Sequence, residues 1–246
     1  MFKSCKKVAA VAILAAGFLG ARQASAADVT VGLDTLLPGG SNAAGITVGD
    51  KLYSGFTLSS SGSTVLNASD ISVNIMSEGN RHDLSFMFDL TAANGQRSDL
   101  VIGYRLDALG SGRIRRIDAM WDGGPFGAGD GRSAASMIET VSTVDGSDLV
   151  AGGPVQDTEI LNLFNDGETG LADTNDFALD IIPQKSLLFV KDILVSSRPN
   201  AGMVGVSVVQ QGVEQTAIPL PAAFWAAMPI FGAVIGRKKL ARLATR

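Results

Sequence analysis

The chain has 246 residues and a formal net charge of −4, but its charged residues are spread unevenly. Nine of the 20 Lys and Arg residues lie in residues 1–26 and 217–246, whereas all 24 Asp and Glu residues lie between these two ends. Residues 27–216 therefore carry 11 basic and 24 acidic residues, a formal charge of −13, which argues against a nucleic-acid or anionic-lipid partner because phosphate attraction needs a basic face.

Residues 1–26 have the pattern of a secretory signal peptide. Three lysines (Lys3, Lys6 and Lys7) precede an apolar run from Val8 to Gly20, and Ala24 and Ala26 occupy the small positions of an A-x-A cleavage site. The apolar run has about 13 residues, too few to cross a bilayer that requires about 20. We expect passage through the secretion translocon and cleavage after Ala26. This cut removes Cys5, the one cysteine, so the exported part has no disulfide and no Cys metal ligand.

Residues 27–216 predict a single antiparallel β-sandwich, either jelly-roll-like or immunoglobulin-like. Apolar and polar residues alternate in ISVNIM (71–76), LSFMFDL (84–90), LVIGYRL (100–106) and MVGVSVV (203–209), which is typical of strands with one buried face. In the last segment we expect Val204, Val206 and Val208 on that face. Clusters of Gly, Asn and Asp separate roughly ten to twelve such strands. A domain of this length buries most of its unfolded-chain surface in one core.

No residue pattern in the chain favours catalysis. The one histidine, His82, lies in GNRHDL at the start of a strand, and the chain has no G-x-S-x-G stretch to present a nucleophilic serine. We expect His82 to be an exposed or half-buried turn residue. Sugar cleavage needs facing carboxylates, and the aromatic residues left to stack on a sugar are few: Trp121, Tyr53 and Tyr104. We therefore expect that the protein is not an enzyme.

Two neighbouring segments have less distinctive patterns. Residues 121–132, WDGGPFGAGDGR, are rich in glycine but lack the G-K-[ST] ending of a phosphate-binding loop, which indicates a flexible surface loop. Residues 133–141, SAASMIETV, fit a short helix, but their β-branched end suits a strand as well.

An acidic stretch at residues 165–180 is the candidate metal site. Its oxygen ligands for calcium are Asp166, Glu168, Asp173, Asp176 and Asp180. Loops rich in carboxylates bind Ca²⁺ in extracellular modules. The spacing departs from the D-x-[DN]-x-[DN]-G loop because Phe177 stands where a third ligand is needed. A plain acidic loop is the favoured interpretation, with calcium as the alternative. No other cofactor is expected.

Residues 217–246 have the pattern of a membrane segment followed by a stop signal. Residues 217–236 contain no charge, and a helix from Pro221 to Gly236 with its extended entry nearly spans the bilayer hydrocarbon. A basic cluster of Arg237, Lys238 and Lys239 follows directly and favours the cytoplasmic side of the inner membrane. The signal peptide places residues 27–216 on the opposite side, so the two signals agree on orientation.

The order of motif, apolar span and basic end resembles the PEP-CTERM sorting signal of exported bacterial proteins. The matching positions are Pro219, Leu220, Pro221 and Ala222, where Leu220 replaces the usual Glu. The resemblance implies recognition and cleavage by an exosortase-type protease in a Gram-negative bacterium, in a biofilm or exopolysaccharide setting. A simple stop-transfer anchor without cleavage is the alternative.

The sequence thus predicts a signal peptide (1–26), an acidic β-sandwich (27–216) and a C-terminal sorting signal (217–246). The predicted function is that of a non-enzymatic protein of the cell surface or extracellular matrix, with a structural or adhesive role. The alternative is a calcium- or carbohydrate-binding module held by an uncleaved membrane anchor.

Overall fold

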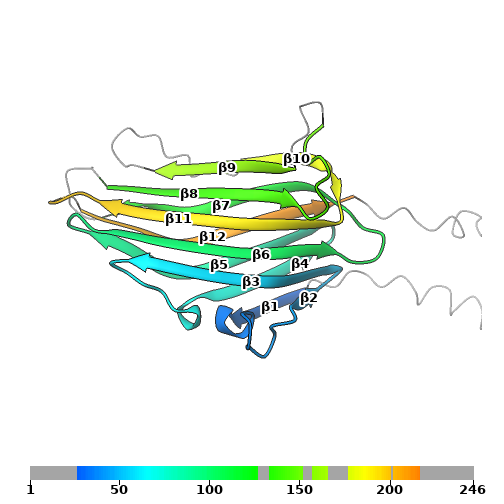
Figure 1. The fold of residues 1–246 in the computed structure, drawn as a ribbon, viewed down its shortest axis with the longest axis horizontal. Helices are drawn as coiled ribbons and strands as arrows, with labels where there is room; N and C mark the ends of the chain where they lie inside the picture. The colour runs from blue at the N-terminus through cyan, green and yellow to red at the C-terminus, as the bar shows by residue number, and fades with distance from the viewer. Residues whose placement is uncertain (1–26, 127–132, 152–156, 166–176, 201, 217–246) are drawn as a thin grey trace, which may run out of the picture. The chain divides into compact units, whose positions relative to one another are not determined.

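The computed structural model describes residues 27–126, 133–151, 157–165, 177–200 and 202–216 (Figure 1). This part of the chain contains twelve strands and two short 3-10 helices. The strands are β1 (Ala27–Gly32), β2 (Ile46–Val48), β3 (Lys51–Gly62), β4 (Ser72–Glu78), β5 (Arg81–Ala93), β6 (Arg97–Ala108), β7 (Ile114–Phe126), β8 (Ser133–Thr143), β9 (Thr158–Asn165), β10 (Phe177–Gln184), β11 (Ser186–Ser197) and β12 (Met203–Gln215). The helices are η1 (Leu33–Thr35) and η2 (Ala68–Asp70).

The twelve strands form two sheets that stack face to face, with their long strands running in nearly the same direction (Figure 1). The first sheet has the order β1-β4-β5-β12-β7-β10 and the second the order β2-β3-β6-β11-β8-β9. Every neighbouring pair is antiparallel. From β5 to β12 the chain changes sheet at every step except the β8–β9 hairpin, and this order is that of a double-sheet jelly roll. The predicted all-β sandwich is confirmed.

The core lies between the sheets and is made by the alternating residues that the sequence indicated. Ile71, Val73 and Ile75 are fully buried, and the same alternation buries the inward residues of β5 and β6. The ring of Tyr104 stacks on that of Phe189 with centroids 5.0 Å apart. Each buried large side chain contributes roughly 1.5–3 kcal/mol, which stabilises the sandwich without disulfides.

The ambiguous segment at residues 133–141 is a strand. It forms most of β8, which pairs with β11 on one side and β9 on the other. Ala135, Met137 and Val141 point into the core and are fully buried. Pairing with two neighbouring strands satisfies the backbone groups along the segment, so tertiary context excludes the helical alternative.

The expectation for Val208 in β12 is wrong. The ladder shifts register between Val206 and Val208 against both neighbouring strands, as a β-bulge does. The extra residue reverses the alternation, so Val209 is fully buried and Val208 is only partly covered. After the bulge the inward positions continue at Gln211, Val213 and Gln215.

β1 begins and β12 ends at the same end of the sandwich. Ala27 of β1 is the register partner of Ser77, and the backbone N–H of Gln215 donates to the carbonyl oxygen of Asn80. Both positions adjoin the turn between β4 and β5. The predicted signal peptide and the predicted sorting signal lie outside the described residues. Within the described ranges, no helix has the length and apolar character needed to span a membrane.

Candidate functional site

The structure describes only one member of the predicted calcium set. Asp180 lies in β10, is exposed, and has Arg116 of β7 as its register partner. The remaining four (Asp166, Glu168, Asp173 and Asp176) lie outside the described residues. Across the described ranges, no three His, Cys, Asp or Glu side chains gather into a set that suits a metal ion.

The aromatic residues considered for sugar stacking lie in the core. Trp121, Tyr53 and Tyr104 are 4%, 1% and 2% exposed. Each occupies an inward position of its strand, so none of the three rings offers a face to a ligand. A prominent exposed aromatic side chain of the described surface is Phe164 on β9.

The prediction that His82 is an exposed or half-buried turn residue is wrong, because His82 is 1% exposed. It shares the inward face of β5 with Leu84 and Phe86, and the turn lies before the strand. Its Nε2 is 3.2 Å from Oδ1 of Asp50. Burial, followed by the positive charge of Lys51, lowers the pKa of His82 to about 4. The ring is therefore neutral at physiological pH.

Lys51 ties the two sheets together at the end where the chain leaves β12. Its ammonium is fully buried, although Lys51 is the first residue of β3. The Nζ atom donates to Oδ1 of Asp50 at 2.5 Å and to Oε1 of Gln215 at 2.7 Å. Burial lowers the pKa of Lys51 because desolvation disfavours the charged form. We call Lys51, Asp50 and Gln215 the terminal tie.

A second tie of the same kind crosses the middle of the sandwich. Lys191 of β11 and Glu139 of β8 are register partners, and both are fully buried. Nζ of Lys191 donates to Oε2 of Glu139 and, at 2.9 Å, to Oε1 of Gln211 on β12 of the other sheet. Burial raises the pKa of Glu139 and lowers the pKa of Lys191, so both shifts favour the neutral forms. We call these three residues the central tie.

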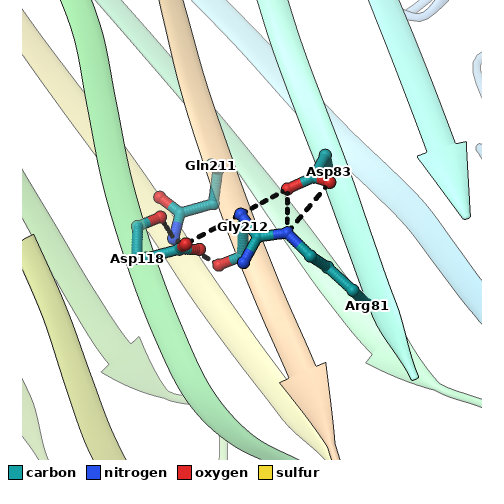
Figure 2. A network of polar contacts seen from close by, with 5 residues as sticks. All are labelled: Arg81, Asp83, Asp118, Gln211 and Gly212. Atoms are coloured by element: carbon teal, nitrogen blue, oxygen red, sulfur yellow. Dashed lines mark hydrogen bonds and ion pairs between the residues drawn. The ribbon is translucent and has the colours of Figure 1, made fainter. Parts of the chain in front are cut away.

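The amide of Gln211 is fixed at its nitrogen as well as at its oxygen. Nε2 donates to the backbone oxygen of Asp118 at 2.8 Å and to that of Gly212 at 3.1 Å (Figure 2). Both carbonyls belong to the ladder between β12 and β7, where Gly212 and Asp118 are register partners. The side-chain amide therefore has one orientation, with its oxygen toward Lys191.

An ion network covers β12 on the outer face of the same sheet, around Gly212 (Figure 2). Nη2 of Arg81 donates to Oδ2 of Asp118 at 2.8 Å, and Nε of Arg81 donates to both carboxylate oxygens of Asp83 at 3.0 and 3.1 Å. A Cβ at Gly212 would lie 1.7 Å from Oδ1 of Asp118. The network therefore fits closely because residue 212 has no side chain.

The sequence reasoning did not identify the residues of the two ties, although their positions gave a signal. In SLLFVKDILV, Lys191 has the same parity as Phe189 and Ile193, the apolar face of the strand. Gln211 and Gln215 likewise share parity with Val209 and Val213. A polar residue inside an alternating apolar face indicates a buried group that needs a partner.

No family model and no curated protein matches the chain. Among solved structures, the chain is similar to TmCBM61 in complex with β-1,4-galactotriose at 10% identity and a TM-score of 0.29, with 62% of this chain and 86% of that chain covered. It is also similar to the enzymatically active domain of tailspike protein 4 of bacteriophage CBA120 at 15% identity and a TM-score of 0.27, with 63% and 19% covered.

A third similar structure belongs to a study of carbohydrate-binding modules from the β-sandwich superfamily, at 6% identity and a TM-score of 0.23, with 79% of this chain and 58% of that chain covered. The chain thus spans less than two thirds of the second and third structures. Two of the three are carbohydrate-binding modules and one is an enzymatic domain, so they do not separate binding from catalysis. The sandwich architecture stands on the strand pairing of this chain itself.

Proposed function

We propose that residues 27–216 are a non-enzymatic structural module of an exported protein, sorted to the cell surface or the extracellular matrix through residues 217–246. The observation that carries this proposal is the attachment of β12. This strand is hydrogen-bonded to β5 and β7 along most of its length. It is also joined to the second sheet by the terminal tie and the central tie.

A strand attached in this way suits a tethered protein. The chain continues from β12 toward the predicted sorting signal, so a pull on that signal acts on β12 first. Two ladders and two buried ties distribute the load over both sheets. Water competes poorly for hydrogen bonds that are buried between the two sheets.

The placement of the reactive side chains supports a structural role rather than a catalytic one. His82, Glu139 and Lys191 are the kinds of group that catalyse acid–base chemistry, and all three are at most 1% exposed. A dissolved substrate does not reach groups sealed between two sheets. These residues are better suited to joining the sheets.

The proposed processing removes no residue of a described strand. β1 begins at Ala27, directly after the proposed cut at Ala26, and β12 ends at Gln215, just before the proposed sorting signal. The proposed signal consists of the motif Pro219, Leu220, Pro221 and Ala222 and the basic cluster Arg237, Lys238 and Lys239. An exosortase cut within this signal leaves the sandwich intact.

The test is the mass of the protein recovered from a Gram-negative host with and without an exosortase. We expect a chain that begins at Ala27, and in the exosortase strain a chain that ends near Pro219. A variant with Pro219→Ala and Pro221→Ala is the matched control and should keep its C-terminus in both strains. Recovery from the cytosol with Met1 and Arg246 in place would refute export. Identical C-termini in both strains would refute cleavage and leave a membrane anchor.

The calcium- or carbohydrate-binding alternative differs from this proposal in a measurable way. It requires a ligand that raises the stability of the folded domain, because a ligand bound only to the native state shifts the folding equilibrium. Asp180 is the one described residue of its candidate metal set, and the three aromatic candidates are buried. Burial of these three rings favours the structural role over sugar stacking, and the calcium alternative is left to this stability measurement.

A further inference from the structure

The central tie places an amine, an amide and a carboxyl group in contact inside a dry core. Nζ of Lys191 touches Oε2 of Glu139 and lies 2.9 Å from Oε1 of Gln211. The carbonyl carbon of Gln211 is one bond, about 1.23 Å, beyond that oxygen. All three side chains are at most 2% exposed. Contact of the amine with the amide oxygen places the two reacting groups side by side, which lowers the entropic cost of amide exchange.

We infer that Lys191 and Gln211 form a covalent amide cross-link between the two sheets, with Glu139 as the catalytic acid and base. This modification goes beyond the proposed structural function and does not depend on export or sorting. It is an intramolecular reaction of the folded chain and needs no co-reactant.

The reaction exchanges one amide for another. Glu139 takes a proton from Nζ of Lys191, and the amine lone pair forms a new bond to Cδ of Gln211 while the carbonyl electron pair moves to Oε1. Glu139 then delivers this proton to Nε2, the Cδ–Nε2 bond breaks as the carbonyl re-forms, and Glu139 takes the second proton from Nζ. The products are a Lys191–Gln211 amide, one ammonia and a protonated Glu139, so protons and charge balance and no oxidant or reductant is involved.

The surroundings of the three side chains favour each step. Burial lowers the pKa of Lys191 and raises the pKa of Glu139, which reduces the cost of moving the proton from the ammonium to the carboxylate. The other carboxylate oxygen, Oε1 of Glu139, is buried and has no hydrogen-bond partner among the described residues, so it is open to carry the proton.

The leaving nitrogen is also prepared. Nε2 of Gln211 donates to the backbone oxygens of Asp118 and Gly212, and these two acceptors hold the nitrogen as it departs (Figure 2). The ion network of Arg81, Asp83 and Asp118 covers the other side of the same backbone. Asp118 and Gly212 are positioning residues here, since they contact the amide without taking the proton.

The terminal tie is a natural comparison within the same molecule. Lys51 also donates to a glutamine oxygen, that of Gln215, and to a carboxylate, that of Asp50. However, Asp50 is 29% exposed, whereas Glu139 is fully buried. Water that reaches the Asp50 carboxylate competes for its contact with the Lys51 ammonium, whereas the Glu139 carboxylate is sealed from water. We therefore assign the cross-link to the central tie.

Peptide mapping of the full chain, purified from its host and denatured, tests the assignment. Cleavage before aspartates and after glutamates places Lys191 in residues 180–191 and Gln211 in residues 192–214. We expect these two peptides to stay joined and their combined mass to be lower by about 17 Da, the mass of one ammonia. Two separate peptides of unchanged mass would overturn the inference. A water-loss product between Lys191 and Glu139 would overturn it as well.

Two variants separate the chemistry from the fold. Glu139→Gln keeps the size of the side chain but removes the base, so we expect two separate peptides in place of the joined pair. Gln215→Met alters the terminal tie and should leave the joined pair unchanged. Joined peptides in Glu139→Gln would refute the role of Glu139. If Glu139→Gln does not fold, the peptide map of the chain without substitutions still decides whether the Lys191–Gln211 bond exists.

Discussion

Replacement of Gly212 by alanine tests the close fit between β12 and the outer-face ion network. A Cβ at this position would lie 1.7 Å from Oδ1 and 2.6 Å from Cγ of Asp118, as well as 2.6 Å from Nη2 of Arg81. The end of the long Arg81 side chain can swing away, but the short Asp118 side chain cannot move without breaking its contact with Arg81. The backbone of Gly212 is not in the positive-φ region, so the obstacle is the carboxylate and not the strand.

The expected magnitude follows from three contributions. Inserting a methyl group into a filled site costs about 1–3 kcal/mol. Displacing Asp118 also weakens its pair with Arg81, which contributes about 1 kcal/mol or less because Arg81 is 40% exposed. Replacing glycine with alanine in a strand returns about 0.5–1 kcal/mol. Gly212→Ala should therefore lower the free energy of unfolding by roughly 1–3 kcal/mol.

The sharper result is expected in a second background. Once Asp118→Ala has removed the carboxylate, the new methyl group has space, and Gly212→Ala should be neutral or stabilising by about 0.5–1 kcal/mol. Urea unfolding of the four proteins in this cycle measures both effects and their coupling. If Gly212→Ala destabilises the protein equally in both backgrounds, the proposed contact with Asp118 is not the cause.

Three further results are expected. The pKa of His82 is about 4 in the fold against a reference value near 6.5, so the fold favours the neutral ring. The free energy of unfolding should therefore be highest above about pH 6.5 and should fall by roughly 3 kcal/mol as the pH drops toward 4. Urea unfolding across this range should show the loss, and His82→Gln should flatten it; an equal slope in both proteins would exclude His82. Lys51→Met removes the donor to Gln215 and should lower the free energy of unfolding by about 1–3 kcal/mol. The control Arg113→Met, at an exposed position, should lower it by less than about 0.5 kcal/mol. Equal urea midpoints for the two variants would contradict a stabilising role of the terminal tie. Millimolar Ca²⁺ or a panel of glycans should leave the melting temperature unchanged, whereas a rise of several degrees would favour the binding-module alternative.

Much of the sandwich is encoded locally and can be predicted from the sequence. Alternation of apolar and polar residues places Ile71, Val73 and Ile75 on one face of a strand, and the structure buries all three. The same rule fails at Val208, because a bulge depends on how two neighbouring strands pair and not on the residues of β12 alone. For His82 the rule pointed to the correct inward face, but the polar character of the residue led to the wrong expectation.

The sequence by itself determined the charge of −13 on residues 27–216, the alternation of the strands and the patterns of the two ends, because each depends only on composition or on neighbouring residues. Only the tertiary structure decided the strand order and which buried groups meet. Lys51 and Gln215 are 164 positions apart, and Glu139 and Lys191 are 52 positions apart. Alternation along a strand predicts that such a side chain points inward, but its partner depends on which strands lie beside it in the sheet and which strands face it across the core.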